Sequence, residues 1–266
     1  MGKNFLSEII VPVKQFFKGE LDIFDPDSSP YAIEYFKKIY GSSDWKLIDE
    51  FDFNNLEKTS NRKGFSRLHI RLNHESSYRN TGMFWMKFKL SGDTEFNFNE
   101  NKEKYLRKKN MSVENKKLLE ECSSKHHTLL NMSLLPTTGS LNVLKSRLSV
   151  PNDGVIIYSS NHTPECLDRQ DTFISALNDY FNNRKNELIL SKSGKNREPL
   201  INYLNEFSNI YDYCNKVLFI KDKSLVNLLI KNGAKPINTE SDVLNYINIA
   251  QQYWEEKEKN ILSLFE

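Results

Sequence analysis

The stretch Lys125–Arg147 reads K-H-H-T-L-L-N-M-S-L-L-P-T-T-G-S-L-N-V-L-K-S-R, and it surrounds an apolar run with hydrogen-bonding and charged side chains. The apolar centre, Leu129–Leu135, predicts a buried strand. Buried polar groups need hydrogen-bond partners. The segment is therefore either a polar structural centre of the fold or the floor of a binding site.

Further strand patterns lie on the N-terminal side of this segment. Trp45–Phe53 predicts a strand, and the alternating stretches Arg67–Leu72 and Met83–Leu90 predict an antiparallel pair joined by a polar loop. Helical spacing of apolar residues dominates the second half instead. We therefore expect an α+β fold, with a mainly antiparallel sheet in the first half packed against helices from the second half.

The helical patterns and the expected surface segments complete this organisation. Helices are predicted at Ala32–Tyr40, Val113–Cys122, Phe173–Phe181, Leu200–Tyr211 and Ser224–Ile230, and a C-terminal helix is predicted around 240–264. A polar, basic excursion is expected around 97–117. We find no internal repeat, so the prediction is one domain over residues 1–266.

Composition narrows the class of protein. The 266 residues carry a formal net charge of +2, so overall charge gives no argument for a polyanion partner. The three cysteines are widely spaced and include no C-x-x-C pair, which favours a reduced cytoplasmic setting and no metal site. No apolar run of about 18 residues or secretory leader pattern occurs, so no membrane partner is expected.

Local charge is less even than the total. Lys102–Lys117 holds seven basic residues against two acidic ones, and Arg184–Arg197 holds five against one. Such runs are most often solvated surface. They also form the kind of patch that binds nucleic acid through its phosphates.

Three motifs support a family resemblance. They are D-P-D-S-S-P at Asp25–Pro30, H-T-L-L-N-M-S-L-L-P at His127–Pro136 and D-R-Q-D-T-F-I at Asp168–Ile174. Because these motifs occur in this order, the chain resembles an uncharacterised bacterial family that is known only as a domain of unknown function. The resemblance implies one continuous domain and brings neither an established activity nor a cofactor.

The candidate catalytic residues are His127, Asp168 and Asp171. A histidine titrates near neutral pH and can act as a general base, although a hydrogen-bonded structural histidine fits the pattern as well. Asp168 and Asp171 precede a helical pattern, where a carboxylate either caps the helix or orients a basic group in a site.

The candidate substrate- or anion-binding residues surround the same segment. Lys145 follows the turn at Thr137–Ser140, where backbone N–H groups at a helix start can hold a phosphate; the alternative is an ordinary helix cap. The full set is Thr128, Asn131, Asn142, Lys145, Arg147 and Arg169.

The leading hypothesis is a cytoplasmic effector directed at nucleic acid or nucleotides, with a phosphate-binding site and a role in phage defence or a toxin-like system. One alternative is a group-transfer enzyme with a nucleotide cofactor, built on His127, Thr128 and Asn131. Another is a non-enzymatic protein-interaction subunit. The sequence leaves open whether the protein is an enzyme, which cofactor it uses and how it oligomerises.

Overall fold

A computed structural model gives the fold. It describes residues 14–15, 17–18, 20, 30–41, 51–60, 66–72, 89–96, 111–125, 128–136, 169–183, 204–233, 235, 237 and 239–265. The named elements in chain order are α2 (Pro30–Gly41), β1 (Phe51–Ser60), β2 (Ser66–Leu72), β3 (Lys89–Thr94), α4 (Val113–Ser124), η3 (Leu129–Asn131), β4 (Met132–Pro136), α6 (Gln170–Asn183), α8 (Ile210–Leu218), α9 (Lys223–Gly233) and α10 (Glu240–Leu262).

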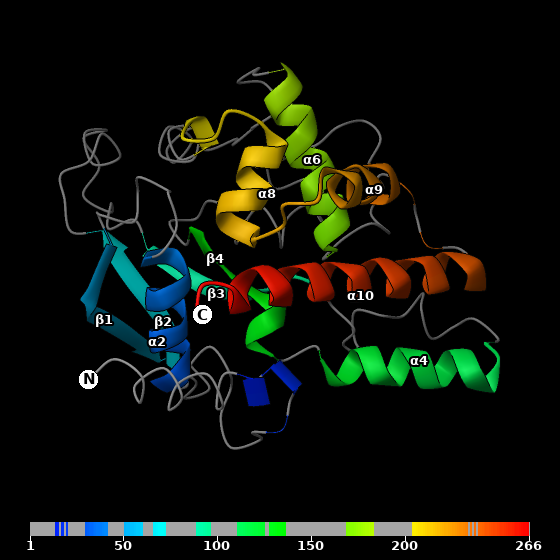
Figure 1. Ribbon diagram of the computed structural model, residues 1–266, viewed down its shortest axis with the longest axis horizontal. Helices are drawn as coiled ribbons and strands as arrows, with labels where there is room; N and C mark the ends of the chain where they lie inside the picture. Colours follow the sequence, from blue (N-terminus) through cyan, green and yellow to red (C-terminus); the bar gives the residue numbers. More distant parts are fainter. Residues whose placement is uncertain are drawn as a thin grey trace.

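The long helix α10 runs through the middle of the molecule (Figure 1). It begins at a capping box, in which the Thr239 hydroxyl accepts from the Asp242 N–H and the Asp242 carboxylate accepts from the Thr239 N–H. Apolar residues then recur at helical spacing and are buried: Val243, Tyr246, Ile247, Ala250, Trp254 and Ile261. α10 therefore presents one continuous face to the core.

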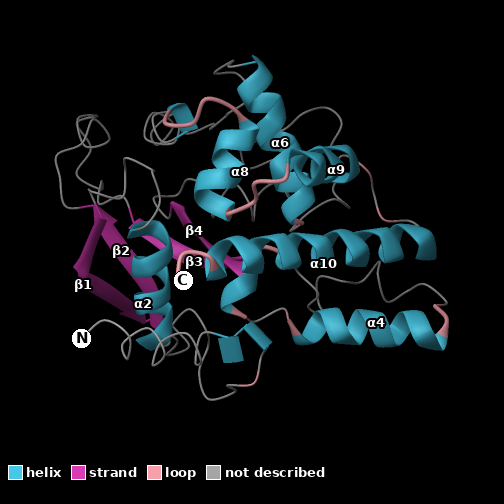
Figure 2. Cartoon of the chain, viewed as in Figure 1, coloured by secondary structure: helices cyan, strands magenta, loops and turns pink. Residues whose placement is uncertain are grey.

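The other helices surround α10. Figure 2 shows α6, α8 and α9 on one side of it and α4 running alongside on the other. The C-terminal end of α2 contacts α8, because the Tyr40 hydroxyl donates to the Val217 carbonyl at 3.0 Å. Phe96 contacts α10 directly, with its ring centroid 5.0 Å from that of Tyr253 and 5.9 Å from that of Trp254. These contacts join residues from both halves of the chain in one core.

Helices α6 and α9 pack closely at Gly233. A Cβ atom at this position would overlap the backbone carbonyl of Asp171. The absence of a side chain therefore lets the last turn of α9 reach the first turn of α6.

Helix α8 ends at a buried aromatic residue in an unusual conformation. Phe219 has φ 60°, in the left-handed region that non-glycine residues seldom adopt. Its carbonyl accepts from Asn260 Nδ2 at 2.8 Å, and its ring centroid lies 5.3 Å from that of Tyr40. These contacts stabilise the sharp turn between α8 and α9.

The strands form a ladder in the order β1-β2-β3-β4, and each neighbouring pair is antiparallel. The expected pairing of Arg67–Leu72 with the next strand along the chain is present, although the register joins His69 to Ser91 and Ile70 to Leu90. Of the predicted strand Met83–Leu90, Lys89 and Leu90 are described and pair with Arg71 and Ile70 as part of β3; residues 83–88 lie outside the described part.

The predicted fold, a mainly antiparallel sheet in the first half packed against helices from the second, is wrong. Helices make up most of the described residues, and two of them, α2 and α4, belong to the first half. Among the strands, only β4 has side chains that the structure describes, those of Met132 and Ser133. The described core is instead a core of helices organised on α10. Alternation detects strands, but it does not show which elements supply the buried surface.

The predicted strand Leu129–Leu135 is also corrected. Its first part is the 3-10 turn η3, and only Met132–Pro136 is extended. Leu129, Leu130 and Asn131 are all buried. A short buried apolar run fits either conformation, because periodicity alone does not separate them.

Candidate functional site

The structure describes four of the residues predicted to form a site: Thr128, Asn131, Arg169 and Asp171. The other five lie outside the described residues: His127, Asn142, Lys145, Arg147 and Asp168. Convergence of the whole set therefore remains a prediction. The four described residues are buried, and an antiparallel backbone bridge between Phe96 and Arg169 links the contacts of Asn131 to those of Arg169.

Asn131 joins Phe96 to α10. Its Oδ1 accepts from the Phe96 backbone N–H and from Trp254 Nε1, both at 2.9 Å, and its Nδ2 donates to the Phe96 carbonyl at 2.7 Å. Thr128 lies three residues earlier, and its hydroxyl donates to the Lys125 carbonyl at 2.9 Å. These contacts give both residues structural roles, as buried polar groups require.

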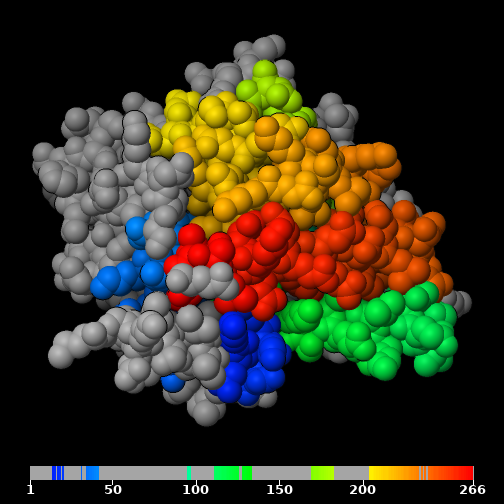
Figure 3. Space-filling view, in the orientation of Figure 1, coloured from blue at the N-terminus to red at the C-terminus, as the bar shows by residue number. Residues whose placement is uncertain are grey.

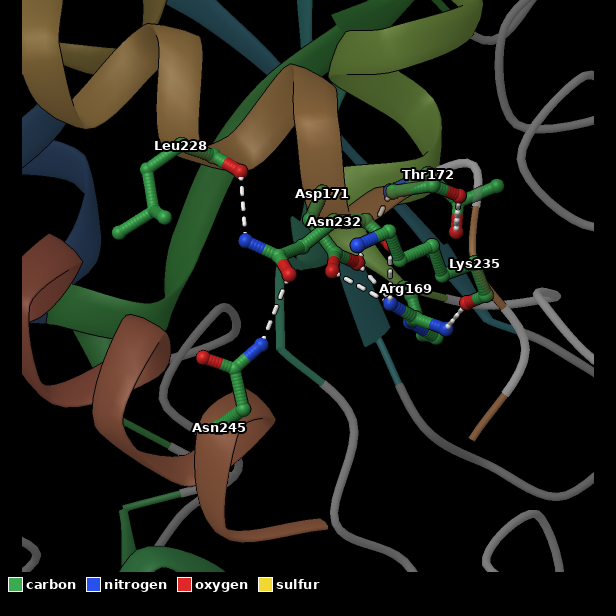
Figure 4. A network of polar contacts seen from close by, with 8 residues as sticks. Arg169, Asp171, Thr172, Leu228, Asn232, Lys235 and Asn245 are labelled. Atoms are coloured by element: carbon green, nitrogen blue, oxygen red, sulfur yellow. Dashed lines mark hydrogen bonds and ion pairs between the residues drawn. The ribbon is translucent and has the colours of Figure 1, made fainter. Parts of the chain in front are cut away.

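Arg169 and Asp171 do meet, as one of the hypotheses for this motif requires. Figure 4 shows their side chains beside the end of α9. Arg169 Nε donates to Asp171 Oδ1 at 3.0 Å, and NH2 donates to Oδ2 at 2.5 Å, with both side chains buried. This two-point geometry is the strongest form of an arginine–carboxylate pair.

The pair also closes the C-terminal end of α9. Arg169 donates to the carbonyls of Asn232 and Lys235, at 3.1 and 2.6 Å, and the Thr172 hydroxyl donates to the Gly233 carbonyl at 2.8 Å. A cation is favourable there because the last carbonyls of a helix carry partial negative charge. These described contacts assign Arg169 and Asp171 to the α6–α9 junction.

A second buried ion pair escaped the sequence prediction. Lys257 donates to both carboxylate oxygens of Glu95, at 2.9 and 2.8 Å, and to the Met132 carbonyl at 2.8 Å. Its side chain is 1% exposed and that of Glu95 is 0% exposed. Lys257 lies in the charged run E-E-K-E-K, which resembles solvated surface, but it follows Trp254 by three residues and Ala250 by seven. That spacing places it on the apolar face of α10 and is the signal that could have found it.

Burial favours the neutral forms of a phenol and two thiols in the described core. Burial, followed by the nearby charge of Glu95, raises the pKa of Tyr253 well above its ordinary value. Burial raises the pKa of the Cys122 thiol to about 11 and also raises that of Cys214. A thiol acts as a nucleophile in its thiolate form. These two cysteines are thus poor candidates for nucleophilic catalysis near neutral pH.

The exposed surface of α9 and its flanks is strongly basic. From Lys216 to Lys235 the chain has five lysines and one acidic residue, Asp222, a run that the charge survey of the sequence overlooked. We define the α9 basic face by its four exposed lysines: Lys221, Lys223, Lys231 and Lys235. On α9, Lys223, Asn227 and Lys231 recur every four residues and are all exposed, so they form one stripe. α8 and α9 lie together on the surface seen in Figure 3.

Other site types lack support in the described part of the chain. There, no group of three or more His, Cys, Asp or Glu side chains is arranged to hold a metal ion. No described helix combines the length and the apolar character that crossing a bilayer requires.

No protein-family model matches the sequence, and neither a curated protein nor a solved structure matches it. The family resemblance therefore stays a prediction.

Proposed function

We propose that the protein binds nucleic acid in the cytoplasm through the α9 basic face. The observation that carries this proposal is the stripe Lys223–Asn227–Lys231 together with exposed Lys221 and Lys235. Binding at such a surface gains free energy because lysines release the counterions condensed on the phosphate backbone.

The charge distribution supports a local binding face. The net charge of the chain is only +2, whereas the segment Lys216–Lys235 has five lysines against one acid. Two further basic runs, Lys102–Lys117 and Arg184–Arg197, supply additional positive charge; of their residues, Lys116 and Lys117 are described and exposed on α4. Clustered charge on a nearly balanced chain is what a polyanion-binding patch requires.

The interior contacts favour this surface over an enclosed enzymatic site. Asn131 and Arg169, which the group-transfer and phosphate-site hypotheses would use, donate to carbonyls and a carboxylate of the protein itself. The α9 lysines are instead exposed. These contacts therefore favour nucleic-acid binding at the surface over an enclosed active site.

Charge reversal on α9 tests the proposal. The variant Lys223→Glu/Lys231→Glu should weaken binding of a labelled oligonucleotide at least tenfold at low salt, and it should reduce the slope of log affinity against log salt by about 2. Fluorescence anisotropy over a salt series measures both quantities.

The matched control is Lys37→Glu/Lys259→Glu, which makes the same charge change on α2 and α10. Lys37 is exposed, and Lys259 has 79% of its side chain exposed. This control should change affinity by about twofold or less. Equal losses in the two variants, or no binding of wild-type protein to DNA or RNA at low salt, would refute the proposal.

A further inference from the structure

The aromatic side chain of Tyr211, on α8, lies beside the α9 basic face. Its hydroxyl donates to Asn227 Oδ1 at 2.7 Å, which fixes the ring beside the middle of the lysine stripe. The ring is half-buried and packs against the edge of the core. Lys223 Nζ lies 5.7 Å from the ring centroid.

A comparison with Tyr213, two residues further along α8, shows that this position is distinctive. Tyr213 is fully buried and its ring lies next to those of Phe173, Phe181 and Phe207. Tyr211 is only partly buried, and the exposed Lys223 lies over its ring. A flexible lysine is easily displaced from a ring, whereas packed core side chains are not.

The N-terminal end of α8 beside Tyr211 is already capped by the protein. Asn209 Oδ1 accepts from the backbone N–H groups of Tyr211 and Asp212, and Asp212 forms an ion pair with Lys216 at 3.0 Å. The ligand-binding chemistry of this surface therefore comes from the Tyr211 ring and the lysines.

Resting on the proposed function, we infer that the α9 basic face binds single-stranded nucleic acid, with an unpaired base stacked on Tyr211. Lysines match the phosphates of any nucleic acid, but an accessible aromatic face adds affinity only for bases that are not already stacked in a duplex. Lys223 would then leave the ring and contact a neighbouring phosphate. DNA and RNA strands share this chemistry.

The experiment compares a labelled single strand of about 12 nucleotides with the same sequence as a duplex. Wild-type protein should bind the single strand more tightly. Tyr211→Leu should weaken single-strand binding about tenfold while leaving duplex affinity within about twofold, and Tyr211→Phe, which keeps the ring, should retain most of the affinity.

Equal or tighter binding of the duplex by wild-type protein would overturn the inference and leave the proposed function standing. The inference would also be overturned if Tyr211→Leu lost the same affinity for the single strand and the duplex at an unchanged melting temperature. If Tyr211→Leu does not fold, the single-strand and duplex affinities of wild-type protein and of Tyr211→Phe still test the inference. Failure of wild-type protein to bind either ligand would instead refute the proposed function.

Discussion

Basic side chains of the interior and those of the α9 basic face lie in opposite environments. Arg169 and Lys257 are 4% and 1% exposed, and each donates to a carboxylate and to backbone carbonyls. Lys223 and Lys231 are exposed on one stripe of α9. The difference teaches that basic residues hold this fold together where they are buried, and that those on the surface are the ones available to a partner.

Lys257→Met should give the largest effect. The substitution keeps much of the side-chain volume but leaves the Glu95 carboxylate buried without its cation. We expect the free energy of unfolding to fall by about 3–5 kcal/mol. Urea denaturation measures the loss.

Lys259→Met is the control for this prediction, because Lys259 lies on the same helix with 79% of its side chain exposed. It should change stability by about 0.5 kcal/mol or less. The double variant Glu95→Leu/Lys257→Met should recover much of the loss, since it removes both charges. Similar stabilities for Lys257→Met and Lys259→Met would abolish the distinction between buried and exposed cations.

Gly233→Ala should rank second. The added Cβ would overlap the Asp171 carbonyl, so α6 and α9 would have to move apart and strain the Arg169 contacts at the helix end. We expect a loss of about 1–3 kcal/mol, as for other overpacked interiors. Thermal melting followed by circular dichroism measures it.

Gly41→Ala provides the comparison, because a Cβ atom there meets nothing within 4 Å. It should be neutral, or stabilising by up to about 1 kcal/mol, because alanine restricts the unfolded chain. If Gly233→Ala left the stability unchanged, helices α6 and α9 would be able to move apart without cost, contrary to this prediction.

The smallest effect concerns Asp212, next to the basic face. Burial alone would raise the pKa of Asp212, but hydrogen bonds from Ser208 and Lys216 and the Lys216 charge outweigh it, so the pKa is lowered. A carboxyl group with a lowered pKa stabilises the fold above its unfolded pKa, near 3.8, and this contribution is lost as pH falls through the folded value.

We therefore expect Asp212→Asn to lower stability by about 0.5 kcal/mol at neutral pH, with the difference from wild type shrinking as the solution is acidified. Melting temperatures over a pH series test this. Lys216→Met should show the same pH trend, since it removes the partner from the same pair. If the stability difference between wild type and Asp212→Asn grew on acidification, the lowered pKa of Asp212 would be contradicted.

Local structure was the most predictable part of the protein. The helices at Ala32–Tyr40, Val113–Cys122 and Ser224–Ile230 are confirmed, within extended bounds, as α2, α4 and α9. Apolar spacing and capping residues act over one or two turns, so they can be read from neighbouring positions. The 3-10 turn at Leu129–Asn131 was missed because its short apolar run carries no period.

Of the candidate site, the sequence left open whether Asp168 or Asp171 caps the helix or orients a basic group, and the structure pairs Asp171 with Arg169, two residues away in the chain. Sequence reasoning missed the carbonyls of Asn232 and Lys235 that Arg169 contacts, and it missed Lys257 as the partner of Glu95, 162 residues away. Contacts at such separations depend on how the helices pack, and periodicity within one helix does not specify them.

By itself, the sequence determined where most of the described helices form and which of their faces are apolar, because both depend on residues a few positions apart. The predicted helix Leu200–Tyr211 was wrong, because residues 206–209 are not helical and α8 spans Ile210–Leu218. Only the tertiary structure decided which charges are buried and which are displayed. Lys257 and Lys259 differ by two positions in one charged run, yet one is 1% exposed and the other 79%. The physical reason is that burial of a charge requires a partner, and packing brings that partner from a distant part of the chain.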